Sequence, residues 1–195
     1  MVFTLIALVL LMIAVVAVVR SVGTSSGIVG NLAFRRDLTN RAELAIASAK
    51  AALNPGGVVH DEGARGTDVA AAHYSATRLP SPSGGLGVPA VLVSNSAYDA
   101  ARYSCMDGAG AALASCSSPG ADGIVIRWVI DRQCVAGTTT FVTDACGFLR
   151  SPKDVGGSSH SLTRKPDPGA RSVFRISVRV TGPRNTEAYI QTTAG

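Results

Sequence analysis

The chain begins with an unbroken apolar stretch, Met1–Val19, which contains no charged residue, no glycine and no proline. A helix rises about 1.5 Å per residue, so this stretch would extend roughly 28 Å, close to the thickness of a bilayer's hydrocarbon core. A helix that is apolar on every side lies either inside a large core or in lipid. Because the chain has only 195 residues and continues with polar sequence, we expect the stretch to lie in lipid.

A cleavable secretory signal is the alternative interpretation of this stretch. Such a signal has basic residues at its start, a shorter apolar run and small residues at the cleavage site. Here no Lys or Arg precedes the apolar run. From the run alone, a plain single-pass anchor is the simplest interpretation. Removal of a short basic leader would also explain the missing charge, and Met1 would then be the first residue of a processed chain.

Residues 20–54 predict a second half of the same helix, with a weak segment at its start. Gly23, Gly27 and Gly30 each cost a helix about 1 kcal/mol relative to alanine. We therefore expect a soft segment here that is able to stretch or unwind.

Apolar residues then recur at helical spacing across Leu32–Leu53. Asn54-Pro55-Gly56-Gly57 ends the pattern, as proline and glycine do just after a helix. The predicted buried face is small and rich in alanine, which suits close packing against a sheet or another helix. It comprises Leu38, Ala42, Ala45, Ala49, Ala52 and Leu53.

Strict alternation of apolar and polar residues predicts strands late in the chain. Residues 124–131 and Phe174–Val180 alternate with period two, and Thr186–Thr193 follows after a turn at Gly182–Asn185. Such alternation is typical of half-buried antiparallel strands. We expect their buried face to cover the amphipathic half of the helix, and residues 151–170 to form a long surface loop.

The middle of the chain is less informative. Residues 58–89 show no clear period, Pro89–Asn95 is an apolar run that could form a short strand, and Tyr98–Cys116 is expected to be irregular with one helical turn. The predicted fold class is α+β, with a long N-terminal helix packed on an antiparallel sheet. The predicted divisions are a membrane half at 1–19, a soft and amphipathic half at 20–54, and a sheet domain at 55–195.

Four cysteines, all in the second half of the chain, place the sheet domain outside the cytoplasm. They show no C-x-x-C spacing and no histidine lies among them, which argues against zinc. An even number beyond a membrane anchor indicates two disulfides in an oxidising compartment. Three pairings are possible. We favour Cys105–Cys116 with Cys134–Cys146, because each pair brackets a stretch rich in Gly, Ser or Thr.

Charge and candidate chemistry argue against catalysis and nucleic-acid binding. The net charge is +5, with no basic block, and aromatic residues make up 5% of the chain. His60-Asp61-Glu62 is the most suggestive cluster, but adjacent residues converge poorly on one metal. Ser158–Ser161 lacks a nearby carboxylate, His73 stands alone, and Trp128 is expected in the core. We expect no enzyme activity, no cofactor, no metal and no small-molecule substrate.

Four stretches resemble PilX-type minor pilins of the type IV pilus. The start, MVFTLIALVLL, looks like the processed start of a class III signal segment, and Asn31–Leu53 resembles the helical stretch that follows it. Gly123–Cys134 (GIVIRWVIDRQC) and Phe174–Gln191 (FRISVRVTGPRNTEAYIQ) resemble the strands and the G-P-R-N-T turn of that family. Residues 55–120 match nothing in it.

The resemblance implies the type IV pilin fold, with disulfide-fastened loops and a processed, N-methylated Met1. Major pilins have a glutamate five residues into the mature chain, where it neutralises the free amine of a neighbouring subunit. Here Leu5 occupies that place, or Ala7 if the register began at Phe3. A subunit without this acid fits a filament end better than a shaft, since a buried unpaired ammonium is costly.

The implied function is initiation of pilus assembly in a tip complex. Its partners would be other minor pilins, the major pilin and a tip adhesin. The chain would lie in the bacterial inner membrane with its sheet domain periplasmic, and later in the extracellular pilus. A role in adhesion, motility or DNA uptake is left open. The alternatives are a minor pseudopilin of a type II secretion system and an unrelated single-pass periplasmic protein.

Overall fold

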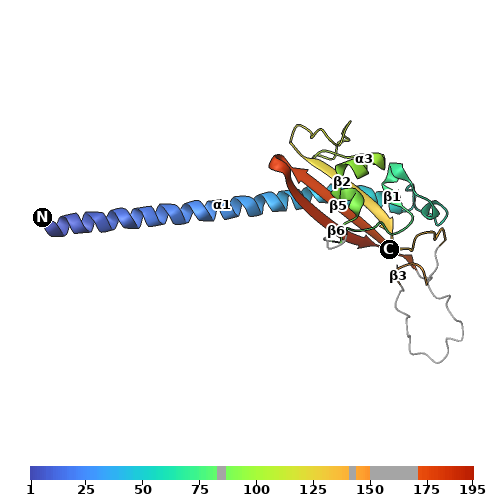
Figure 1. Ribbon diagram of the computed structural model, residues 1–195, viewed down its shortest axis with the longest axis horizontal. Helices are drawn as coiled ribbons and strands as arrows, with labels where there is room; N and C mark the ends of the chain where they lie inside the picture. Colours follow the sequence, from blue (N-terminus) through green and yellow to red (C-terminus); the bar gives the residue numbers. More distant parts are fainter. Residues whose placement is uncertain (83–86, 141–143, 150–170) are drawn as a thin grey trace, which may run out of the picture. The chain divides into compact units, whose positions relative to one another are not determined.

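A computed structural model describes residues 1–82, 87–140, 144–149 and 171–195, with the backbone alone of residues 22–28 (Figure 1). The chain divides into two compact units, Met1–Leu38 and Thr39–Gly195. One continuous helix, α1 (Val2–Leu53), supplies all of the first unit after Met1 and the start of the second. The long N-terminal helix predicted from the apolar run and the amphipathic pattern is therefore confirmed.

The second unit contains the strands and several short helices. After α1 the described elements are η1 (Ala64–Gly66), η2 (Ala70–Ala72), β1 (Tyr74–Ser75), α2 (Ala90–Val93), α3 (Asn95–Ala100), β2 (Val125–Arg132), β3 (Phe148–Leu149), β4 (Arg171–Ser172), β5 (Phe174–Gly182), η3 (Pro183–Asn185) and β6 (Thr186–Ala194). The α+β class is confirmed. The predicted loop at 151–170 lies outside the described residues.

The main sheet has the strand order β1-β2-β5-β6. The three strands expected from alternation, β2, β5 and β6, pair antiparallel as predicted, with Trp128 opposite Val178 and Val178 opposite Ile190. The added strand β1 pairs parallel with β2, so the sheet is mixed, with an antiparallel part formed by the three predicted strands. β1 has only two residues, which is too short to give a period in the sequence.

The sheet carries packed residues on both faces. One cluster joins Val125 and Val129 of β2 to Leu92 of α2 and Tyr98 of α3. Ile126 and Ile130 alternate with these valines and point to the opposite face, because side chains alternate along a strand. Figure 1 shows α2 (green) in front of the strands and the last turns of α1 behind them.

The last turns of α1 bury most of the face that the sequence predicted. Ala42, Ala45, Ala49 and Leu53 are buried, Ala52 is half-buried, and Ile46 is a further buried residue that the pattern missed. The helix ends at the predicted residue. Gly56 follows it with a φ of +89°, a conformation that favours glycine.

One strand prediction is wrong. The run Pro89–Asn95 forms the helix α2 and the start of α3, with Pro89 immediately before the first helical turn. A short apolar run cannot be distinguished from a buried helical turn by periodicity. Leu92, which is fully buried against the sheet, fits either conformation.

Candidate functional site: the apolar stem and the disulfide-bonded unit

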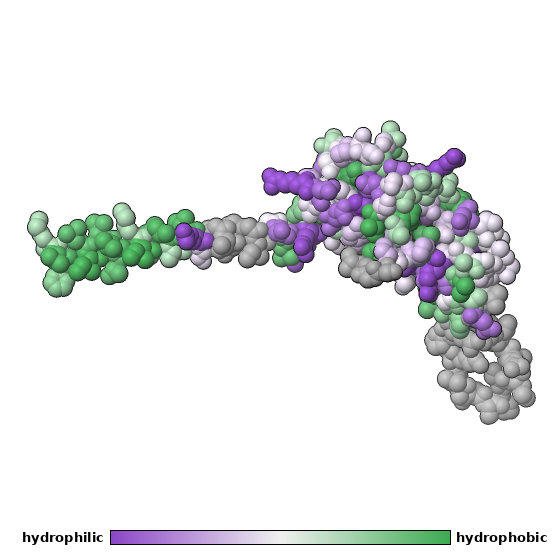
Figure 2. Space-filling model, viewed as in Figure 1, coloured by the Kyte–Doolittle hydropathy of each residue, from purple (hydrophilic) through white to green (hydrophobic). Residues whose placement is uncertain are grey.

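The most distinctive surface of the protein is the first part of α1. We call Val2–Ser21 the apolar stem. It is long and apolar enough to cross a membrane, judged by length and composition, and none of it is buried in the protein. Leu5 and Val9 are 65% and 55% exposed. Figure 2 shows the stem as an almost continuous hydrophobic surface. So much exposed apolar surface indicates a lipid or protein contact.

The first turn of the stem contains no acidic side chain. The Thr4 hydroxyl donates a hydrogen bond to the Met1 carbonyl at 2.6 Å, and the Leu5 amide donates to the same oxygen at 3.3 Å. The earliest carboxylate in the sequence is Asp37. Leu5 therefore presents an apolar side chain where the resemblance places a glutamate in major pilins. Processing at Met1 stays a prediction.

The predicted soft segment belongs to the same continuous helix. α1 passes through Gly23, Gly27 and Gly30 without a break. A β-carbon added at Gly30 would meet no atom within 4 Å, so packing against a neighbour does not require glycine there. The ability of this segment to stretch stays a prediction.

Both disulfides have the predicted local pairing. Cys105 is bonded to Cys116 with 5.6 Å between Cα atoms, and Cys134 is bonded to Cys146 with 3.9 Å. All four cysteines are buried. The first bridge closes a loop that precedes β2, and the second begins two residues after β2 ends at Arg132. The bridges therefore hold the loops at both ends of this central strand.

Strand β2 is buried on both faces, which corrects the prediction of a half-buried strand. The charged residues that the alternation placed toward water are instead buried, Arg127 against the Cys116 carbonyl and Asp131 beside Leu79. Asp131 is fully buried and accepts from Arg175 at 2.9 and 2.8 Å. The Leu79 amide and the Gln133 side chain also donate to Asp131, at 3.2 and 2.9 Å. The pairing partners could not be recognised from the sequence.

Arg179, a buried cation on β5, anchors α2 and α3 to the sheet. Nη1 of Arg179, on β5, donates to the Leu92 carbonyl at 2.9 Å and to the Asn95 side chain at 2.9 Å, and Nη2 donates to Glu187. Arg179 is 6% exposed. These bonds satisfy carbonyls at the end of a four-residue helix that has little stability of its own.

His73, which stands alone in the sequence, has several partners in the fold. Its ring lies 3.8 Å from the Trp128 ring, centroid to centroid. Nδ1 lies 3.2 Å from the Trp128 carbonyl, which only accepts, so Nδ1 carries the proton. Nε2 then accepts from the Ser104 hydroxyl at 2.7 Å. Burial lowers the pKa of His73 from 6.5 to about 4, although the bond to the Trp128 carbonyl raises it slightly.

His73 and Tyr98 together complete one edge of β2. Met106 pairs with Ile126, and the His73 carbonyl accepts from Ile130 at 2.7 Å. Between these two points, the Trp128 amide donates to the Tyr98 hydroxyl at 3.2 Å, and the Trp128 carbonyl accepts from His73. The two side chains replace a missing strand partner, since a buried backbone group without one is costly. Trp128 is buried, as predicted.

The His60-Asp61-Glu62 cluster does not converge on one point. Nε2 of His60 lies 3.7 Å from Asp61, whereas Glu62 pairs with the buried Arg132. Within residues 1–82, 87–140, 144–149 and 171–195, no three His, Cys, Asp or Glu side chains are placed to hold a metal ion. Ser158–Ser161 lies outside the described residues.

Comparisons with protein-family models, with curated proteins and with solved structures found no match to this chain. The resemblance of the sequence to minor pilins therefore stays a prediction. The evidence for it comes from the stem and from the second unit, Thr39–Gly195, which we call the disulfide-bonded unit.

Proposed function

We propose that the protein is a PilX-type minor pilin that helps to start type IV pilus assembly near the filament tip. One observation carries this proposal. A 52-residue helix exposes an apolar, acid-free stem and continues into an α+β unit with two disulfides. The stem suits a bilayer and a bundle of similar helices equally well, and the disulfides suit the oxidising side of a membrane.

The mechanism is physical transfer of the stem from lipid to protein. In the inner membrane the stem contacts acyl chains, and in the filament it contacts other apolar helices. Because both surroundings are apolar, the transfer loses little hydrophobic free energy. The partners would be other minor pilins, the major pilin and a tip adhesin, with the disulfide-bonded unit first in the periplasm and then on the pilus.

Leu5 supports a position at the end of the filament. A charged amine buried in a helix bundle needs a nearby acid, and the first turn of this stem supplies none. A filament tolerates one such subunit at its end, where no amine of a neighbouring subunit needs an acid. We therefore expect few copies per pilus.

The proposal is tested by gene deletion and two matched substitutions. We expect deletion in the encoding bacterium to reduce pilus number sharply, as counted by electron microscopy, and the wild-type chain to restore it. Val9→Asp places a charge in the stem and should fail to restore pili. Val135→Asp makes the same change on the disulfide-bonded unit, where the side chain is 64% exposed, and should restore them. Unchanged pilus number after deletion contradicts the proposal.

The place of the subunit in the filament is tested by Leu5→Glu. Restoring the acid should increase the ratio of this chain to major pilin in sheared pili, measured by quantitative mass spectrometry. The same spectra should show an N-methylated Met1. Normal pili together with a loss of protein secretion would favour a minor pseudopilin instead.

A further inference from the structure

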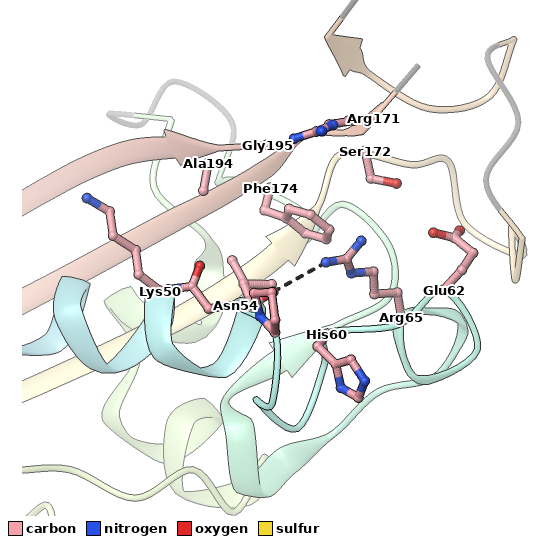
Figure 3. A pocket seen from close by; sticks show the side chains of 12 residues that line it. Lys50, Asn54, His60, Glu62, Arg65, Arg171, Ser172, Phe174, Ala194 and Gly195 are labelled. Carbon is pink, nitrogen blue, oxygen red and sulfur yellow. Dashed lines mark hydrogen bonds between the residues drawn. The ribbon is translucent and has the colours of Figure 1, made fainter. Parts of the chain in front are cut away.

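A cavity of about 420 Å³ lies where the end of α1 meets β4 and the adjoining ends of β5 and β6 (Figure 3). Its walls come from the last turn of α1, the loop after it, the residues around β4, and the ends of β5 and β6. The lining residues are Lys50, Leu53, Asn54, Pro55, His60, Glu62, Arg65, Arg171, Ser172, Phe174, Ala194 and Gly195. The volume is in the range of small-molecule sites.

Arg65 is held in this cavity by two hydrogen bonds and a ring contact. Nε donates to the Val59 carbonyl at 3.0 Å and Nη2 to the Leu53 carbonyl at 3.3 Å, and the guanidinium lies 5.0 Å from the centroid of the Phe174 ring. The Arg65 carbonyl in turn accepts from the Tyr74 hydroxyl at 2.9 Å. Among the described residues, none of the hydrogen bonds of Arg65 uses Nη1. The fold therefore fixes a cation and leaves one of its donor groups for another acceptor.

The charges around the cavity favour an anion. The single carboxylate among the lining side chains, Glu62, already pairs with Arg132, which is fully buried. Lys50, Arg65 and Arg171 supply three positive charges. Even with a negative charge on the main chain at Gly195, the cavity keeps an excess of positive charge. An anion that enters would meet preorganised donors.

The remaining walls favour an apolar body on that anion. Leu53 and Phe174 are buried residues that border the cavity, and Pro55 and Ala194 add apolar surface. We propose that this cavity binds a carboxylate joined to a small apolar group, with the carboxylate on Arg65 and the apolar part against Phe174. The carboxylate could belong to a free organic acid or to an acidic side chain of a partner. This proposal does not depend on the proposed function.

The test uses the full chain in nonionic micelles and 4-fluorobenzoate as the probe, observed by fluorine NMR line broadening. The neutral 4-fluorobenzamide has nearly the same shape, and empty micelles give the background from partition into detergent. We expect broadening by the protein for the benzoate, and at least tenfold weaker binding for the benzamide, because it lacks the charge.

Variants locate the binding site. Arg65→Gln should weaken benzoate binding about tenfold. Because Arg65 also holds two backbone carbonyls, this variant also weakens the fold, and the double variant Lys50→Met with Arg171→Gln provides a second test. It removes two charges without removing any hydrogen bond described for the cavity, and should weaken binding at least threefold. Arg184→Gln, at the opposite end of the β5–β6 hairpin, should leave binding unchanged.

Competition identifies the source of the carboxylate. Displacement of the probe by N-acetylglutamate amide supports an acidic side chain, and displacement by butyrate alone supports a free acid. Either result supports the assignment. Equal binding of benzoate and benzamide overturns the assignment. Displacement of the probe by inorganic phosphate as effectively as by the competing carboxylates also overturns it. Unchanged binding in the double variant also overturns it.

Discussion

The buried ion pair between Asp131 and Arg175 gives the sharpest test of the fold. Asp131 is fully buried, and its two oxygens accept four hydrogen bonds, two of them from Arg175. The Arg175 side chain is only 16% exposed. Asp131→Asn keeps the size of the side chain but removes the negative charge. It also replaces one acceptor oxygen by an NH2 group, which then faces the N–H groups that donated to that oxygen. The Arg175 cation is then left largely buried without its counter-charge.

The expected loss is large compared with the stability of an ordinary domain. Removing one partner of a buried ion pair costs about 3–5 kcal/mol, whereas domains unfold with about 5–15 kcal/mol. For a unit of this size, each 1 kcal/mol lowers the melting temperature by about 2–4 °C. We therefore expect a decrease of roughly 6–20 °C. The matched control is Asp122→Asn, because Asp122 pairs with Arg41 at 3.1 Å and both side chains are about 30% exposed. It should cost at most about 1 kcal/mol.

Trp128 provides the assay. It is the single tryptophan of the chain, it is buried, and it lies on the same strand as Asp131. Urea titration of the full chain in nonionic micelles, with disulfides intact, should follow unfolding through its fluorescence. If Asp131→Asn loses no more stability than Asp122→Asn, the ion pair does not hold Leu79 and Gly87 on the sheet, and the burial of Asp131 does not have the proposed energetic weight.

Three further predictions concern His73, the first disulfide and the soft segment of α1. His73 has a pKa of about 4 in the folded chain and about 6.5 when unfolded, so its stabilising contribution is present above pH 6.5 and is lost as the pH falls toward 4. Between pH 7.5 and 4.5, wild-type should lose about 2–3 kcal/mol more than His73→Asn in urea titrations, and an equal loss would contradict the burial argument. Replacing both Cys105 and Cys116 by serine should cost about 3 kcal/mol, because the bridge closes a short loop; a cost near zero would show that the loop is ordered without it. Gly30→Ala should slow amide exchange around residue 30 about fivefold, since alanine favours the helix by about 1 kcal/mol and an added methyl group meets nothing; faster exchange would contradict this.

The sequence by itself determined the features that depend on neighbours along the chain. The stem follows from Met1–Val19, because hydrocarbon length and the absence of charge are properties of a continuous run. The β5–β6 hairpin follows from two alternating runs and the Gly-Pro-Arg-Asn turn between them. The cysteine pairing was favoured correctly because each bridge closes a local loop.

Only the tertiary structure decided which surfaces are covered. Asp131 and Arg175 look like solvent-facing positions in alternating strands, but Asp131 is fully buried and the Arg175 side chain is only 16% exposed, because Leu79 and Gly87 lie against them. The sequence cannot show this cover, since Leu79 and Gly87 belong to a stretch with no clear period. His73 likewise obtains its function in the fold from Trp128, 55 residues away, whose backbone needs a partner that no strand supplies. A charge or a ring is placed by what packs against it, and packing brings together residues that are distant in the chain.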